Sequence, residues 1–250
     1  MRNLLLAGMV MVGAAMSLAG CRKEKSTAGN ATLNIEIEHM AAGSTMVLNT
    51  DVQTPLGEPV RYTVFKYYLS HVALQKDDGS RETLPVSYHL VDESVSSSKS
   101  IAFVIPTGSY KSLIFTMGVD SARNVSGVQE GALDPANGMF WTWNSGYIMA
   151  KMEGKSPLST APLQNITFHI GGFRQANSVL RTVELPFPSA TVHEGKSLAI
   201  TLSANVDKWW NGKSDIHIGS ATVIMEPGDA AMKMADNYAT MFTINSVQTH

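Results

Sequence analysis

The run TLNIEIEH at residues 32–39 alternates apolar and polar side chains along its whole length. Leu33, Ile35 and Ile37 stand at every second position, and His39 continues the same series. Successive side chains of a β-strand point to opposite faces of the sheet, so a period of two is typical of a strand with one buried face. The run therefore predicts a first strand whose apolar face, with His39 at its end, points into a core.

Similar patterns continue through the rest of the chain. Stretches rich in β-branched and aromatic residues occur at 62–74, 101–105, 110–117, 165–170, 179–185, 197–206 and 220–225. Turn-forming residues separate them, and the best candidate helix covers only residues 228–237. Many short strands joined by turns favour an all-β fold, which we expect to be a single antiparallel β-sandwich domain.

Composition excludes several classes of protein. The 250 residues are 44% hydrophobic and 16% charged, which supports a folded core rather than intrinsic disorder. The 19 Lys and Arg side chains against 21 Asp and Glu give a formal net charge of -2, without the basic surface that nucleic-acid binding needs. The sequence carries no G-x-S-x-G or H-E-x-x-H motif and no phosphate-binding loop, so we expect a binding protein rather than an enzyme.

The N-terminal residues have the layout of a secretory signal. Arg2 precedes an apolar run at 4–18, and about fifteen residues is short of the roughly 20 that span a membrane. A short membrane anchor helix is the alternative. Leu18-Ala19-Gly20-Cys21 resembles the bacterial lipobox, so Cys21, the single cysteine, is the predicted lipidation site. Acylation there would hold the protein in the cell envelope, at the outer membrane, on its periplasmic or surface side. We expect a signal peptide at 1–20, a polar tether at 21–31 and one folded domain at 32–250.

The region from residue 118 to residue 154 contains an unusually long loop. Loops longer than roughly 12 to 15 residues are uncommon unless they are functional. Trp141 and Trp143 lie two residues apart, so in an extended segment their indoles would project to one face. They could stack on a sugar, pack as a corner of the core or relay an oxidising equivalent. Oxygen-bearing side chains precede them and would tie down the loop or hold calcium: Asp120, Asn124, Asp134 and Asn137.

The motifs of this region form an ordered series. They are GVD at 118–120, LDP at 133–135, GMFWTW at 138–143, GY at 146–147 and KMEG at 151–154. Further motifs are EIEH at 36–39, KYYLS at 66–70, SYHLVD at 87–92 and HIGGF at 169–173. Together they resemble the MbnP-like family of secreted proteins, named for their association with methanobactin systems, over roughly residues 32–247. The resemblance implies copper binding outside the cytoplasm, often beside a di-haem peroxidase-like partner.

The resemblance also implies which side chains bind the metal. By the family's pattern, the histidine that closes the first strand and a second one further on are ligands, which here are His39 and His89. Imidazole suits copper, and Cu(I) accepts few ligands. A core histidine bonded to the backbone or to a carboxylate is the alternative for each. In copper-binding relatives a tryptophan oxidised to kynurenine follows closely, whereas residues 40–45 contain no tryptophan. His169, opposite the apolar face of its strand, is a further candidate.

These observations predict a copper-binding envelope lipoprotein that works with a di-haem peroxidase-like partner. The loop with Asp120, Asn124, Asp134, Trp141 and Trp143 would support the site or contact the partner. The alternative is a lipoprotein that binds a glycan or another surface ligand on the two indoles, without a metal. Exposure separates the two functions, because a stacking platform must be open. A scaffold without a ligand, with its histidines far apart, is the third possibility.

Overall fold

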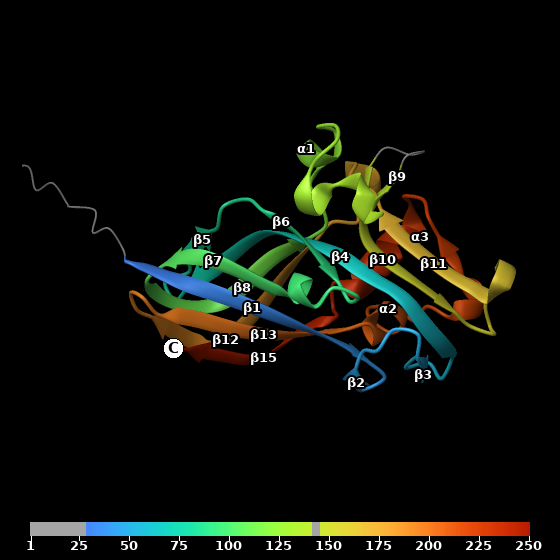
Figure 1. Ribbon diagram of the computed structural model, residues 1–250, viewed down its shortest axis with the longest axis horizontal. Helices are drawn as coiled ribbons and strands as arrows, with labels where there is room; N and C mark the ends of the chain where they lie inside the picture. The colour runs from blue at the N-terminus through green and yellow to red at the C-terminus, as the bar shows by residue number, and fades with distance from the viewer. Residues whose placement is uncertain (1–28, 142–145) are drawn as a thin grey trace, which may run out of the picture.

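The computed structural model describes residues 29–141 and 146–250 (Figure 1). The predicted first strand forms β1 (Asn30–Ala41), and its buried and exposed residues alternate as the sequence indicates. Leu33, Ile35 and Ile37 are buried, and so is His39. Because the apolar face of β1 needs a partner surface, the strand packs against a second sheet.

The described strands form two sheets. The first has the order β15 (Phe242–Thr249), β13 (Ser197–Asn205), β1 and β2 (Ser44–Thr45), with β7 (Ser100–Pro106) also paired to β1. The second has the order β12 (Arg181–Val192), β8 (Gly108–Met117), β4 (Pro59–Lys76), β10 (Gly146–Lys155), β11 (Asn165–Gly171) and β14 (Val223–Ile224). Further strands pair with β4 or β10: β3 (Asp51–Gln53), β5 (Arg81–Thr83), β6 (Tyr88–Asp92) and β9 (Phe140–Trp141).

The all-β prediction is confirmed, but a purely antiparallel sandwich is not correct. Strand β1 runs parallel to β13, with Thr32 beside Ser197, and β11 runs parallel to β14. A parallel pair needs a long connection, and here most of the second sheet lies between β1 and β13 in the chain. The alternation of side chains is the same in both kinds of pairing, which is why the sequence did not distinguish them.

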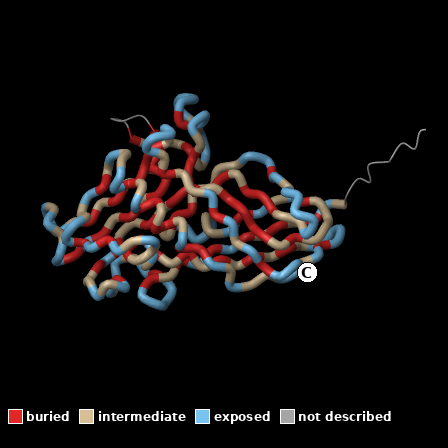
Figure 2. Tube along the Cα trace, turned by 180° about the vertical axis from the view of Figure 1, so that it is seen from behind, coloured by how far each residue is buried: buried red, intermediate tan, exposed pale blue. Residues whose placement is uncertain are grey.

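The core lies between the two sheets, where the buried segments run in Figure 2. The long strand β4 crosses the second sheet and pairs with strands on both of its sides. Beyond the end of β13, buried Trp209 and Trp210 continue the core, and the Nε1 of Trp210 donates to the Tyr62 hydroxyl on β4. Large aromatic side chains thus close the sandwich where the first sheet ends.

Helices are few and short in the described residues. The predicted helix near the C-terminus is confirmed as α3 (Asp229–Tyr238), which lies against β11. No helix in residues 29–141 or 146–250 has the length and apolar character needed to cross a membrane. The remaining helical turns are α1 (Ser121–Asn124), α2 (Asp207–Trp210), η1 (Ser96–Lys99), η2 (Gly131–Leu133), η3 (Pro135–Asn137), η4 (Pro162–Gln164), η5 (Gln175–Asn177) and η6 (Ile218–Ser220).

Candidate functional site

The long loop leaves the second sheet after β8 and rises above it, carrying α1, η2 and η3, before it returns as β9 and β10 (Figure 1). Asp120 caps α1, because its Oδ1 accepts the backbone N–H of Arg123 at 3.1 Å. Asn124 is buried and joins the two sides of the loop. Its Nδ2 donates to the Val119 carbonyl at 2.7 Å, and its Oδ1 accepts the N–H of Tyr147 at 2.8 Å. These bonds fix the base of the loop.

The middle of the loop is held in the same way. Asp134 accepts the N–H of Ala136 at 2.8 Å, and Asn137 donates to the Gly131 carbonyl at 2.9 Å. From the sheet, the hydroxyl of Tyr68 donates to the Ala132 carbonyl. The interpretation that these Asx side chains tie down the loop is therefore confirmed, and each has its oxygen or amide engaged with nearby backbone.

Trp141 packs at the foot of this loop. Its side chain is only 4% exposed, and its ring lies so close to Gly171 that a Cβ there would come within 2.5 Å of it. A covered indole of this kind belongs to a corner of the core and cannot offer an open stacking platform. Trp143 and Cys21 lie outside the described residues.

His39 is buried and engaged at both ring nitrogens. Its Nδ1 lies 2.7 Å from Oε2 of Glu93, and its Nε2 lies 2.8 Å from the hydroxyl of Tyr67. Lys99 reaches the same Glu93 oxygen with its Nζ at 2.9 Å. The ring also meets Phe65 edge to face, with centroids 4.9 Å apart.

These contacts determine which atoms of Glu93, His39 and Tyr67 carry a proton. Burial alone would raise the pKa of Glu93, yet hydrogen bonds from His39 and Lys99 hold it below its ordinary value. The ionised carboxylate can only accept, so Nδ1 of His39 carries a proton and donates it to Glu93. Burial lowers the pKa of His39 and keeps the ring neutral. Its Nε2 is therefore an acceptor, and Tyr67 is the donor.

The other two predicted histidines lie elsewhere. His89 on β6 contacts the Ser87 hydroxyl through Nε2 at 2.9 Å and meets the ring of Phe103. It lies four residues before Glu93, the carboxylate partner of His39, which at a strand rise of about 3.3 Å per residue is a backbone separation of about 13 Å. The structure therefore does not bring His39 and His89 together.

His169 on β11 binds a neighbour on β10. Its Nε2 lies 2.7 Å from Oε1 of Glu153, which Lys151 also approaches at 3.2 Å. The bond to His169 is the main reason why the pKa of Glu153 falls to about 2. Among residues 29–141 and 146–250, no group of three or more His, Cys, Asp and Glu side chains has an arrangement that could hold a metal ion.

A fourth histidine, which sequence reasoning missed, stands at the base of the long loop. His71 lies on β4 with φ of 52°, and the pairing of β4 with β8 shifts register between Ser70 and Ala73. A histidine with positive φ inside a strand is uncommon and costs free energy, on the order of 1–3 kcal/mol. The bulge turns the ring toward the loop, where Nε2 lies 3.5 Å from Oδ2 of Asp120. Tyr88 donates its hydroxyl to the same Asp120 oxygen.

The hydrogen bonds around His71 determine which atoms face each other. The hydroxyl of Ser70 donates to the Gly118 carbonyl at 2.8 Å, so toward Nδ1 of His71, at 3.0 Å, it can only accept. A neutral His71 then directs the lone pair of Nε2 at Asp120. Burial alone would raise the pKa of Asp120, but hydrogen bonds from Tyr88 and the Arg123 backbone hold it low, and the carboxylate is ionised. Two acceptors thus face each other, and a proton or a bound cation between them removes the repulsion.

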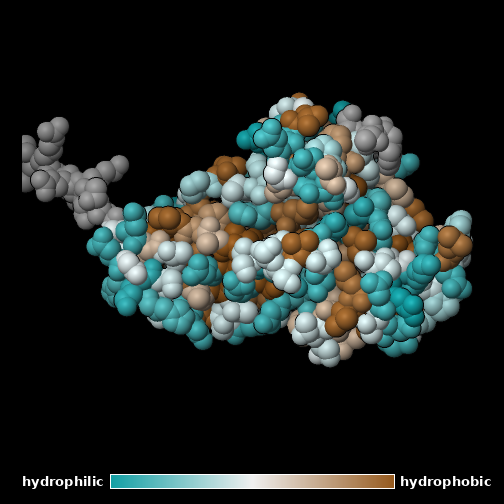
Figure 3. Space-filling view, in the orientation of Figure 1, coloured by the Kyte–Doolittle hydropathy of each residue, from teal (hydrophilic) through white to brown (hydrophobic). Residues whose placement is uncertain are grey.

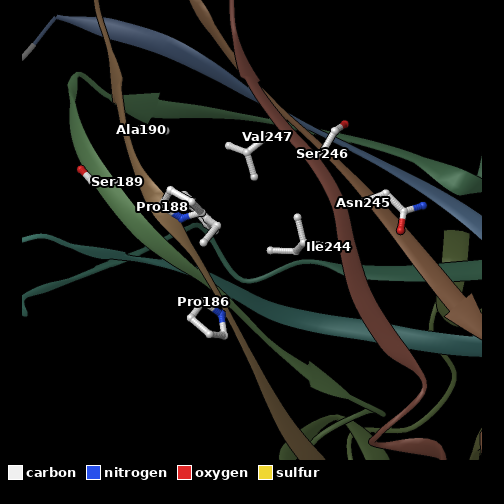
Figure 4. A pocket seen from close by; sticks show the side chains of 9 residues that line it. Pro186, Pro188, Ser189, Ala190, Ile244, Asn245, Ser246 and Val247 are labelled. Carbon is white, nitrogen blue, oxygen red and sulfur yellow. The ribbon is translucent and has the colours of Figure 1, made fainter.

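A separate hollow of about 410 Å³ lies between β12 and β15 (Figure 4). Its wall is formed by Pro186, Phe187, Pro188, Ser189, Ala190, Ile244, Asn245, Ser246 and Val247. None of these is a titratable or metal-ligating side chain, so the chemistry of the described residues concentrates at His39 and His71 instead.

Comparison with known proteins gives three findings. The model of a protein family described as MbnP matches residues 30–226. The solved structure of MbnP from Methylosinus trichosporium is similar to the chain, with a TM-score of 0.46 and 11% sequence identity, over 69% of this chain and 76% of that one. No curated protein matches.

Proposed function

Because the chain belongs to the MbnP family, we propose that it is a copper-binding lipoprotein of the bacterial cell envelope. The family match spans residues 30–226, which include the long loop and every described strand of the two sheets except β15. The copper ligands must come from the donors that this chain provides, and two groups of residues offer an imidazole.

The pair first implied by the resemblance does not fit a copper ion as it stands. Both nitrogens of His39 are occupied by Glu93 and Tyr67, and His89 lies on β6, four residues before Glu93. A metal would have to break the core network to reach His39.

The pair of His71 and Asp120 does fit. Imidazole and carboxylate are both ligands of Cu(II), and two ligands of one ion at bonds of about 2 Å lie roughly 3 to 4 Å apart. Nε2 and Oδ2 are 3.5 Å apart, and the two side chains are 36% and 27% exposed, so an ion can reach them. The observation that carries the proposal is that these two acceptor atoms face each other at 3.5 Å, a separation that a shared cation can bridge as well as a proton can.

The loop above this pair supplies a surface for a partner. Val125 and Val128 are strongly exposed on it, and Figure 3 shows an apolar area at the top of this projection. Exposed apolar side chains in a projecting loop suit contact with another protein. We propose that a di-haem peroxidase-like protein docks there, and that the chain delivers or presents copper without catalysing a reaction. Acylated Cys21, at the end of the signal sequence, would provide the membrane anchor.

The metal site is tested by titrating the purified protein with Cu(II). Asparagine tolerates positive φ, so His71→Asn removes the imidazole while preserving the bulge. We expect this variant to lose one copper equivalent or at least about tenfold in affinity, and Asp120→Asn to weaken binding as well. His217→Asn is the matched control, because it removes an exposed imidazole that also contacts a carboxylate, that of Glu58. Its copper affinity should not change.

Three outcomes contradict the proposal, at different levels. Undiminished copper binding by His71→Asn would refute the assignment of the site to His71. Loss of binding in His39→Gln alone would show that the buried His39 is the copper ligand instead. A wild-type protein that binds no copper would refute the function. The intact mass of protein from its own envelope tests the anchor, since acylation at Cys21 adds the mass of the acyl chains and removal of residues 1–20 subtracts theirs.

A further inference from the structure

The seven tyrosines of the chain all lie in the described residues, and they differ in where their hydroxyl groups point. Four donate to backbone carbonyls: Tyr68, Tyr110, Tyr147 and Tyr238. The hydroxyl of Tyr62 accepts a hydrogen bond from Trp210, and that of Tyr88 donates to the Asp120 carboxylate. Tyr67 alone among them donates to an imidazole.

This difference matters for redox chemistry. A phenol that loses one electron becomes a strong acid, and in a buried site the resulting positive charge is costly unless the proton leaves at the same time. A backbone carbonyl is too weakly basic to take that proton. The neutral imidazole of His39 can take it, and its Nε2 is already 2.8 Å from the Tyr67 oxygen.

We propose that Tyr67 is a redox-active tyrosine, which gives one electron to a high-potential oxidant of the ferryl-haem class while its phenolic proton passes to His39. The O–H bond of Tyr67 breaks and an N–H bond forms at Nε2 of His39. The products are a neutral tyrosyl radical, an imidazolium ion and the oxidant reduced by one electron. Return of one electron reverses both changes. The haem partner of the proposed function enters only as the natural source of the oxidant.

The surroundings of His39 stabilise the charge that this step creates. Imidazolium would donate through Nδ1 to the ionised Glu93 carboxylate at 2.7 Å, a charge-assisted hydrogen bond. Only the proton has to move, because the Tyr67 oxygen and Nε2 of His39 are already at hydrogen-bond distance and exchange the roles of donor and acceptor. In the resting protein, burial raises the pKa of Tyr67 well above its ordinary value, so the phenol keeps its proton until it is oxidised.

The network also has access to the surface. Glu93 and Lys99 are 12% and 22% exposed, so solvent begins two side chains away from Tyr67. On the other side, the ring of Tyr67 meets Phe242 at 5.7 Å between centroids, and Phe242 meets Phe115 at 4.9 Å. Because Glu93 and Lys99 reach the surface beside β6 and η1, an oxidant bound there can exchange an electron with Tyr67 without opening the core.

The test uses photo-oxidised tris(bipyridine)ruthenium as the oxidant, with the full protein free of copper and of any partner. Tyrosyl radicals are detected by electron paramagnetic resonance and by transient absorption. We expect a tyrosyl signal in the wild type that falls at least about tenfold in Tyr67→Phe, which keeps the buried ring and removes only the hydroxyl. Tyr68→Phe is the matched control, since it removes a buried hydroxyl that donates to a carbonyl, and its signal should equal that of the wild type.

Variants of the proton acceptor separate redox chemistry from packing. His39→Gln should slow radical formation at least about tenfold, and Glu93→Gln, which leaves the imidazole in place, should slow it less. Formation in the wild type should also be slower in D₂O. The proposal is overturned if Tyr67→Phe keeps the wild-type signal, if Tyr88→Phe abolishes it, or if the wild type gives no tyrosyl radical. Because no copper or haem is present, these results are independent of the outcome of the copper titration.

Discussion

Replacing Asn124 by alanine should loosen the attachment of the long loop to the sheet. The side chain makes three hydrogen bonds in a buried position: from Nδ2 to the carbonyls of Val119 and Asp120, and from the N–H of Tyr147 to Oδ1. At a net value of about 1 kcal/mol each, their loss should lower the free energy of unfolding by about 3 kcal/mol. The N–H of Tyr147, left without its acceptor, contributes part of that cost.

Urea unfolding of Asn124→Ala and wild type measures the difference as a shift of the midpoint at constant slope. Asn137→Ala is the matched control, because Asn137 also donates to two loop carbonyls but is only partly buried, and about 1 kcal/mol or less is expected. A loss under about 1 kcal/mol for Asn124→Ala, or equal losses for both variants, would show that burial of these bonds does not hold the loop.

Two further predictions concern the core. Burial holds the pKa of His39 below 6.5 in the folded protein. On acidification the unfolded chain therefore binds a proton at this residue before the folded protein does. The free energy of unfolding should then fall as the pH decreases from about 6.5. The urea midpoints of wild type and His39→Gln should therefore approach each other as the pH falls. A difference between the two midpoints that stays constant with pH would contradict this. Gly171→Ala would place a Cβ 2.5 Å from the Trp141 ring and should cost about 1–3 kcal/mol of stability. Gly219→Ala, with no atom closer than 4.0 Å, is the control, and equal thermal midpoints for both variants would contradict the packing argument.

Local patterns predicted those parts of the fold that depend on one strand or one turn. The alternation in residues 32–39 correctly gave β1 and the inward direction of His39. The Asx side chains of the long loop were correctly interpreted, because their partners lie within a few residues. The pattern at 220–225 was less informative, since only Val223 and Ile224 pair as a strand and η6 occupies the preceding residues.

The arrangement of the site depends on contacts between distant strands and on a bulge in β4, neither of which can be read from a local sequence pattern. Whether His39 and His89 share a metal depends on how β1 of the first sheet packs against β4 and β6 of the second, because His39 contacts Tyr67 on β4 whereas His89 lies on β6 opposite Leu69. The importance of His71 follows from a bulge in β4, and nothing in an apolar run marks the residue that takes positive φ. The polar pair Ser70-His71 inside that run was the one available signal. Predictions for Cys21 and for the partner stay predictions.

The parallel pairing of β1 with β13 has a consequence for how the protein folds. Strand β1 pairs on one side with β7 and on the other with β13, where Thr32 meets Ser197, 165 residues later in the chain. The first sheet therefore cannot be completed until nearly the whole polypeptide is available, and such long-range contacts slow folding. Until then, β1 presents an open edge that other chains could pair with. Folding should consequently be slow and sensitive to protein concentration, and chains truncated before residue 197 should aggregate rather than accumulate as a partly folded domain.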